Sequence, residues 1–281
     1  MELKQRIFME VVTQGSFSKA ADTLFMSQPA VCQHIKQYEQ ELGVLLFDRS
    51  TKKLRLTAAG HLTLAFCRNV TRLQQEFTQA LDDLTNEVKG NLIIGASYSY
   101  GEYILPSVMA RFLQQYPDVT PQIVIHNTTD IAEQVLNQQI DVGIVEGFVK
   151  HPQLERSRLA QDQMVLVANK PLDTLTGDET WIIREQGSGT RAAIERFWHA
   201  QQIKPKKLQQ FGSTQLIKGS VMAGIGISLL SKWTVEQEIA QQQLFAIDAP
   251  RYTWNRDFYC IHLKEQTKPK VVTTFIKSLT T

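Results

Sequence analysis

Apolar side chains recur every three or four positions at the start of the chain, as they do on one face of an amphipathic helix. The positions are Leu3, Ile7, Phe8, Val11 and Val12. Gly15 is expected to end this helix. A second helix is predicted over residues 19–25, with Ser18 as its cap and a narrow apolar stripe at Ala20, Ala21 and Leu24.

A third helix is predicted to begin after Ser27, a favourable N-terminal cap. Pro29 is tolerated there because the first-turn amides of a helix have no intrahelical partner. Gly43 is expected to end the helix, whose apolar face runs through Val31, Ile35, Tyr38 and Leu42. The polar positions are Gln28, Gln33, His34, Lys36 and Gln37.

Two helices joined by a tight turn, the second opening with short polar side chains, form the geometry that places a recognition helix in the major groove. The amides of Gln28 and Gln33 suit base edges, and Ala30 suits a thymine methyl. An ordinary three-helix bundle is the alternative interpretation of these segments.

The segment 49–57 alternates Leu54 and Leu56 with Lys53 and Arg55, which predicts a short hairpin or wing. Its cations are expected to meet DNA phosphates. This wing favours DNA binding over a simple bundle.

A long helix capped by Thr57 is predicted over residues 58–88, without proline or interior glycine. Its apolar positions follow heptad-like steps at Phe66, Val70, Leu73, Phe77, Ala80, Leu84 and Val88. Such a seam needs a partner, either the chain's own C-terminal part or a second copy. Polar residues on the other faces, such as Arg72, Gln75 and Gln79, favour a dimer helix.

Strand and helix patterns alternate through the rest of the chain, which predicts two α/β lobes with a mainly parallel sheet open at its carboxyl edge. Strands are expected over residues 91–97, 122–126, 141–145, 164–168, 181–184 and 258–263. Helices are expected over residues 103–115, 130–138, 191–200 and 214–223.

Short polar side chains gather where these strands lead into helices, and helix N-terminal amides suit a small anion. The candidate effector-binding residues are Ser97, Ser99, Tyr100, Thr128, Thr129, Glu146, Ser188, Thr190, Ser213 and Thr214. Plain helix capping is the alternative role for each serine and threonine. Glu146 lies at the same edge and would repel an anion unless Arg191 or another cation balances it.

Composition narrows the function further. The net charge of +2 is too small to identify a nucleic-acid binder, but Arg49, Lys52, Lys53 and Arg55 form a compact basic stripe. The three cysteines, Cys32, Cys67 and Cys260, are far apart and odd in number, so neither a disulfide framework nor a zinc site is expected. We expect a cytoplasmic protein without membrane contact, because no apolar run reaches the roughly 18 residues of a membrane span and the N-terminus has a single short apolar stretch without a small-residue cleavage site.

Three other functions are weighed against DNA binding. An enzyme would need Ser97, Ser99, His126, Asp141 and Glu146 as reacting groups, but the sequence has no nucleophile elbow, metal-ligand cluster or phosphate loop. A transporter's solute-binding protein would lack the DNA-reading head. A thiol switch would rest on Cys260, which has no resolving partner. We therefore expect no catalytic residues, no metal and no cofactor.

The whole pattern resembles the LysR family of transcription regulators. The resemblance is unbroken over FMEVVTQGSFSKAADTLFMSQPAVCQHIKQYEQELGVLLFDRSTKKLRLTAAG, from Phe8 to Gly60. The motifs GASYSYGEYILP, REQGSGTR and GSTQLIKGSVMAGIGISLLS resemble the family's effector domain, which is similar to periplasmic binding proteins.

The resemblance implies an α+β multidomain fold. A winged helix-turn-helix is expected over residues 1–57, a linker and dimerisation helix over 58–89, and a two-lobed effector domain over 90–281. The lobes are expected over about 90–162 plus 264–281, and 163–263.

The resemblance also implies roles for the residues of the head. Ser27, Gln28, Pro29 and Ala30 would begin the recognition helix, and Gln33, His34 and Lys36 would lie along it. The DNA backbone and wing contacts would come from Arg49, Lys52, Lys53 and Arg55. Cys32 stands where the family usually has serine, so a phosphate contact is weakened there.

The implied function is a transcription regulator controlled by a small effector between the lobes, an inorganic oxyanion or a small organic acid. The implied partners are an inverted-repeat site in double-stranded DNA, a second copy in a homodimer, a dimer of dimers, and RNA polymerase. Gln186 replaces the proline of the REPGSGTR-like loop that the family's sensors of sulfur oxyanions or metabolic acids often carry. The alternative is a solute-binding or enzymatic α/β domain whose N-terminal part serves only oligomerisation.

Overall fold

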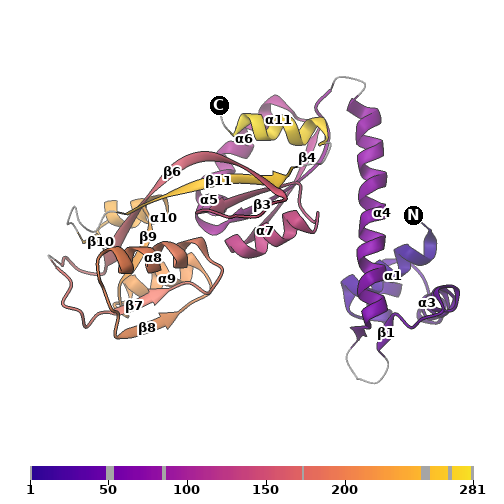
Figure 1. Cartoon of the computed structure of the whole chain (residues 1–281), viewed down its shortest axis with the longest axis horizontal. Coiled ribbons are helices and arrows are strands. Elements are labelled where there is room, and N and C mark those ends of the chain that lie inside the picture. The colour runs from indigo at the N-terminus through magenta and orange to yellow at the C-terminus, as the bar shows by residue number, and fades with distance from the viewer. Residues whose placement is uncertain are drawn as a thin grey trace. The chain divides into compact units, whose positions relative to one another are not determined.

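The computed structural model describes residues 2–48, 54–83, 87–172, 174–247, 254–264 and 268–279. The chain forms two compact units, Met1–Thr85 and Asn86–Thr281 (Figure 1). The first unit contains α1 (Leu3–Gln14), α2 (Phe17–Thr23), α3 (Gln28–Leu42), β1 (Phe47–Asp48), β2 (Arg55–Leu56) and α4 (Ala58–Asp83).

The caps of the first unit agree with the sequence analysis except at α2. Gly15 and Gly43 end α1 and α3 with positive φ angles of 60° and 68°. The predicted start of the second helix is wrong, because Ser16 caps it two residues earlier, accepting a 3.4 Å hydrogen bond from the Lys19 amide. Ser16 and Ser18 both suit a cap, and only Ser16 has the extended backbone that a cap needs.

The core of the first unit is aromatic at its centre. Phe8 of α1 packs edge-on against Tyr38 of α3, with 6.2 Å between ring centroids, and at a tilt against Phe47 of β1, with 5.5 Å between centroids. Ala20 and Ala21 are buried beneath them. Because this core includes Phe47 and Leu46, the start of the wing is fixed to the helices.

The long helix α4 begins as predicted, since Thr57 Oγ1 accepts a 3.0 Å hydrogen bond from the Gly60 amide. The predicted end at Val88 is wrong, because residues 87–89 are not helical and the next strand begins at Gly90. Val88 is apolar because it packs against the hydrophobic core of the second unit. Leu84 lies outside the described residues.

The second unit contains one large sheet, a two-stranded sheet and seven helices among its described residues. The strands are β3 (Gly90–Ser97), β4 (Val119–His126), β5 (Val142–Glu146), β6 (Leu154–Ala168), β7 (Thr180–Ile183), β8 (Lys207–Gln210), β9 (Ser228–Ser231), β10 (Phe245–Ala246) and β11 (Trp254–Leu263). The helices are α5 (Tyr98–Tyr103), α6 (Leu105–Gln115), α7 (Thr128–Leu136), α8 (Gly189–Ala200), α9 (Thr214–Met222), α10 (Lys232–Ala240) and α11 (Lys270–Ser278).

The large sheet is mixed, and the prediction of a mainly parallel sheet is correct only in part. Its order is β10-β6-β11-β5-β3-β4, with β9 also paired to β6. β3 runs parallel to β4 and β5, whereas β11 runs antiparallel to β5 and β6. The long strands β6 and β11 lie side by side and extend through both lobes (Figure 1).

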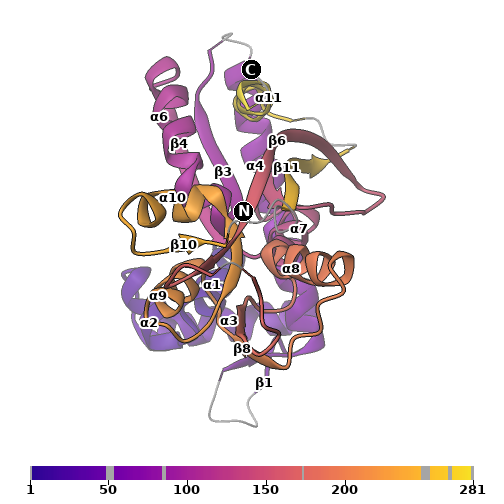
Figure 2. The same ribbon diagram turned by 90° about the vertical axis from the view of Figure 1, so that its left-hand side faces the viewer.

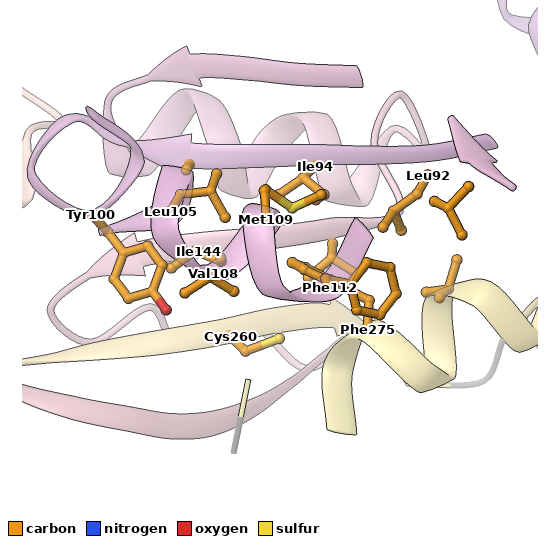
Figure 3. Close-up of a cluster of buried hydrophobic side chains, with 14 of the residues drawn as sticks. Leu92, Ile94, Tyr100, Leu105, Val108, Met109, Phe112, Ile144, Cys260 and Phe275 are labelled. Atoms are coloured by element: carbon orange, nitrogen blue, oxygen red, sulfur yellow. The ribbon is translucent and has the colours of Figure 1, made fainter. Parts of the chain in front are cut away.

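The helices α6 and α11 lie on one face of the first lobe and α7 lies on the other (Figure 1). Figure 3 shows Phe112 of α6 and Phe275 of α11 meeting over Leu92 and Ile94 of β3. The rings of Phe112 and Phe275 are 5.2 Å apart at their centroids. This core holds β3 and β5 rigidly, and with them the strand ends that face the second lobe.

The second lobe repeats this layering. α8 packs with Trp181 and Ile183 of β7, whereas α9 packs with Ile182, so the two helices lie on opposite faces (Figure 2). The helix expected over residues 103–115 is α6, which begins two residues later and has proline in its first turn. The short helix α5 before it, which ends at Tyr103, was not predicted. The sequence analysis did not predict β8, β9, β10, α10 or α11.

No helix in the described part of the chain is long and apolar enough to cross a membrane.

Candidate functional site

The N-terminal end of α3 presents polar side chains to solvent. Ser27 Oγ accepts a 3.4 Å hydrogen bond from the Ala30 amide, which fixes the start of the helix as predicted. The exposed residues of the predicted DNA-contacting set in this helix are Ser27, Gln28, Pro29, Gln33 and Lys36. Ala30 and His34 are half-buried, as is Cys32. DNA contact by these residues stays a prediction.

A hydrogen bond connects the start of α2 to the start of α3. Ser18 Oγ donates to Gln28 Oε1 at 2.9 Å, and both side chains are exposed. The bond orients the carboxamide of Gln28 and leaves its NH₂ group available. Ser18, expected as a helix cap, instead touches a residue of the predicted recognition face.

A buried carboxylate connects α3 to the wing. Glu39 is 4% exposed, and its Oε1 accepts hydrogen bonds from the amides of Leu46 at 2.9 Å and Phe47 at 3.4 Å. The sequence analysis missed this residue, because a glutamate among polar neighbours carries no local signal of burial. Its position fixes the first wing strand relative to the helix.

The wing is a short antiparallel pair in which Phe47 lies opposite Leu56 and Asp48 opposite Arg55. Arg55 is exposed, as a phosphate contact requires. Arg49, Lys52 and Lys53 lie outside the described residues.

The predicted seam of α4 is exposed. Phe66, Leu73 and Phe77 are 54%, 56% and 67% exposed, and Leu62 and Leu81 are exposed beside them. Val70 is half-buried. Large apolar side chains in such a row bury favourably against a second helix.

In the second unit the predicted strand-end residues meet around Glu146. The Ser97 and Thr128 hydroxyls are 3.2 Å apart, and Thr128 donates to the Glu146 carbonyl at 3.2 Å. The Ser99 amide donates to Glu146 Oε1 at 2.7 Å, and Thr190 Oγ1 donates to Glu146 Oε2 at 3.0 Å. These groups come from the end of β3 and from α5, α7 and α8, and therefore from both lobes.

Arg256 of β11 is the cation that balances Glu146. Its Nη1 lies 2.6 Å from Glu146 Oε2, and its Nε lies 2.7 Å from Asp162 Oδ2 of β6. The guanidinium also donates to Thr190 at 3.0 Å and to Ser99 Oγ at 2.9 Å. Arg191, which the sequence analysis named for this role, instead pairs with Glu195 and donates to the Arg184 carbonyl.

The two carboxylates of this network respond differently to burial. Burial by itself raises the pKa of Glu146, but Arg256 and the hydrogen bonds from Ser99 and Thr190 bring it below its ordinary value. For Asp162 burial outweighs Arg256 and the Ser231 hydroxyl, so its pKa is raised. Of the two carboxylates, Glu146 is therefore the one that favours the ionised form.

The remaining predicted residues have structural partners. Ser188 and Ser213 cap α8 and α9, accepting from the amides of Arg191 and Leu216. Thr214 accepts a 3.2 Å hydrogen bond from Arg184 Nη1. Tyr100 packs against Phe258 at 5.2 Å in the core of the first lobe. Effector contact by these residues stays a prediction.

A cavity of about 800 Å³ lies between α7, the β5–β6 connection and α8. Of the predicted effector residues, Thr128, Thr129, Glu146 and Ser188 line it. Its cationic lining residues include Lys150, Arg191 and Arg196, and its apolar ones include Ala132, Leu136, Phe148 and Leu154. The Thr129 amide donates across the cleft to the Gly187 carbonyl at 3.1 Å, so the lobes touch beside the cavity.

Each of the two units matches a known protein family. Residues 4–61 match the family described as bacterial regulatory helix-turn-helix protein, lysR family. Residues 85–281 match the LysR substrate binding domain. The chain belongs to the LysR family. It is a DNA-binding transcription regulator with an effector-binding domain, as the sequence predicted.

Curated relatives of this LysR regulator cover nearly all of its length. It is 31% identical over 286 residues to the HTH-type transcriptional regulator CysL of Bacillus subtilis, which covers 97% of this chain and 95% of that protein. It is 35% identical over 254 residues to a probable RuBisCO transcriptional regulator of Synechocystis sp., which covers 85% of this chain and 74% of that protein. Both of these relatives are transcriptional regulators.

Solved structures of LysR regulators confirm the predicted fold class. Full-length CbnR, solved in complex with its target DNA, has a TM-score of 0.74 and 24% identity and covers 99% of both chains. The regulatory domain of CcmR from Synechocystis PCC6803, solved in complex with 2-PG, has a TM-score of 0.61 and 26% identity, covering 68% of this chain and 96% of that one.

Two of the three cysteines of this LysR regulator, Cys67 and Cys260, are buried. Burial raises the pKa of Cys67, and it raises that of Cys260 to about 12, so neither thiol ionises readily near neutral pH. Within the described ranges, no group of three histidine, cysteine, aspartate or glutamate residues is placed to hold a metal.

Proposed function

We propose that this LysR regulator reads an inverted-repeat operator as a homodimer, and that a small organic acid bound between its lobes controls it. The observation that carries the effector part is the interlobe cavity, which combines cationic and apolar lining. Its volume of about 800 Å³ lies in the range typical of small-molecule sites and far exceeds an inorganic oxyanion. An acid with an apolar body fits both properties.

Two cationic side chains that line the cavity could bind the carboxylate of such an acid. Lys150 and Arg196 are exposed at the cavity and have no carboxylate partner among the residues that the structure describes. Arg191 is already paired with Glu195. Lys150 and Arg196 are therefore the groups we assign to the effector's carboxylate, with Thr128, Thr129 and Ser188 as neighbouring hydrogen-bonding groups.

In the DNA-reading head, we assign base contacts to Gln28 and Gln33 and backbone contacts to Arg55. Ser27, Pro29, Ala30, His34 and Lys36 complete the recognition surface, and Arg49, Lys52 and Lys53 complete the basic stripe. Two such heads must be held together to read an inverted repeat, because a two-fold site mirrors a two-fold protein. The exposed seam of α4 supplies the surface for that pairing, and two dimers would form the tetramer.

Control follows from unequal binding of the effector to open and closed lobe arrangements. The contact between Thr129 and Gly187 and the network around Arg256 both join the lobes, so a ligand beside them alters the balance. The change would reach DNA as an altered spacing or bend between the two heads.

Ligand binding tests the effector assignment. A panel of small carboxylic and phosphorylated acids is titrated calorimetrically into the full chain, and the best ligand into Arg196→Gln and Lys150→Gln. Each variant is expected to bind roughly tenfold more weakly, because a charge-assisted hydrogen bond is lost. Lys232→Gln, an exposed position on α10, is the matched control and keeps wild-type affinity.

Footprints of operator DNA with and without the saturating ligand complete the test. The proposal expects the protected region or its bending to change. An unchanged footprint and unchanged transcription would contradict it.

The dimer seam has its own test. Phe77→Glu places a charge in the exposed row and is expected to shift sedimentation toward the monomer and to weaken operator binding. Leu216→Glu on α9, at a similarly exposed leucine, is the control. Equal sedimentation of both variants and wild type would exclude the seam as the dimer contact.

A further inference from the structure

The carboxylate of Glu146 has the surroundings of a bound anion. It is 3% exposed and receives hydrogen bonds from the Ser99 amide, the Thr190 hydroxyl and the Arg256 guanidinium. All three donor residues are themselves buried. One guanidinium, one amide and one hydroxyl form a donor set that would equally suit a free carboxylate.

These donors come from three separate parts of the second unit. Ser99 belongs to the first lobe, Thr190 to the second lobe, and Arg256 to a strand that runs through both. The start of α8 rests directly on Glu146, since a Cβ atom at Gly189 would lie 2.2 Å from the Glu146 carbonyl oxygen. The full set of donors around the carboxylate is therefore assembled only when the lobes are together, because Thr190 comes from the second lobe.

We propose that Glu146 is a built-in carboxylate ligand of the interlobe cleft, occupying the position that a small free anion would otherwise take between Ser99, Thr190 and Arg256. The inference also says which class of effector the remaining cavity accepts. That part rests on the proposed function, in which a small acid binds between the lobes.

The negative charge of Glu146 limits which effector groups can lie beside it in the cavity. Glu146 forms part of the wall of the cavity, so an anionic group at that wall would meet a carboxylate whose donors are already used. Lys150 and Arg196 also line the cavity and provide the alternative position for it. The cavity thus takes an organic acid whose end nearest Glu146 is uncharged or donates hydrogen bonds, and inorganic oxyanions are excluded from the Arg256 position.

The buried charge of Arg256 also explains why a carboxylate is required at this position. Arg256 pairs with Asp162 as well, so removing Glu146 would leave its guanidinium with one carboxylate. The Ser99 amide, the Thr190 hydroxyl and one N–H of Arg256 Nη1 would lose their acceptor. Buried donors without partners are costly, so an emptied site should take up a small anion from solution.

Chemical rescue with formate tests this. In Glu146→Ala, formate is expected to raise the melting temperature by roughly 3–5 °C at about ten times its Kd, relative to chloride at equal ionic strength. Wild type is expected to show no such formate-specific rise. Glu146→Gln keeps the volume filled and is expected to behave like wild type.

Glu236→Ala on α10 is the matched control, because Glu236 is exposed and without a recorded partner in the described part of the chain. A formate response of equal size in wild type, Glu146→Gln and the control would overturn the proposal. So would a folded Glu146→Ala that does not respond.

Glu146→Ala could be too unstable to fold in chloride. In that case the folded yield after refolding from urea is compared in formate and in chloride. The proposal expects a higher folded yield in formate than in chloride, and equal yields would overturn it. Neither measurement uses DNA or effector, so a failure here leaves the proposed function standing, and a failure of the effector titrations leaves this result standing.

Discussion

Ser18 donates a 2.9 Å hydrogen bond to Oε1 of Gln28, so the first turn of α2 holds the first side chain of α3. With its oxygen engaged, the Gln28 carboxamide presents its NH₂ group, which suits the N7 acceptor of a purine in the major groove. Ser18 is then a positioning residue for base reading, although it need not touch a base itself.

Removal of this hydroxyl should reduce sequence discrimination. Gln28→Ala is expected to lower the ratio of operator to random-DNA affinity by roughly 5- to 150-fold, which corresponds to about 1–3 kcal/mol of discrimination at one base pair. Ser18→Ala should lower it about 2- to 10-fold, which is the worth of one hydrogen bond, and Ser18→Thr should restore it. The double variant should be no worse than Gln28→Ala, measured by titration at one fixed salt concentration. Additive losses in the double variant would show that Ser18 acts independently.

Arg55 should behave differently, because a phosphate contact carries no sequence information. Arg55→Ala is expected to weaken operator and random DNA by the same factor. The slope of log affinity against log salt should become smaller by about 1. A selective loss at the operator alone would assign Arg55 to base reading instead.

Glu39 should matter to stability rather than to DNA contact. Glu39→Ala removes the acceptor of the Leu46 amide, and a buried unpaired donor costs about 1–3 kcal/mol of the free energy of unfolding. Glu41→Ala removes only an exposed pair with Lys4, which contributes less than about 1 kcal/mol. Urea unfolding of the full chain, followed by a probe in the first unit, separates the two values. Equal losses would mean that the buried hydrogen bonds to the wing contribute nothing.

His262 should make the second unit sensitive to mild acid. Burial lowers its pKa below the ordinary value of about 6.5, so the unfolded chain binds the proton more readily. The stability contribution of the neutral ring is present above pH 6.5 and is lost as the pH falls through the folded-state pKa. Melting temperatures between pH 8 and 5 should therefore fall more steeply for wild type than for His262→Gln. Parallel curves would show that His262 does not contribute to this slope.

Much of the first unit could be predicted from the sequence, because the relevant signals are local. Helix caps at Ser27, Gly43 and Thr57 depend on residues three or four positions away, and the structure has them where the pattern placed them. The exposed faces of α3 and α4 follow from helical periodicity in the same way. The error at Ser18 arose because two serines satisfied the same local rule.

The sequence by itself determined the family, the order of helices and strands in the first unit, and the set of hydroxyls at the strand ends. Only the tertiary structure decided what those hydroxyls and Glu146 bind. Arg256 lies 110 residues from Glu146, in a polar stretch just before the strand predicted over 258–263, so no periodicity marks it as buried. Its place depends on β11 pairing antiparallel with both β5 and β6, and the pairing of distant strands is set by the packing of the whole core rather than by neighbouring residues.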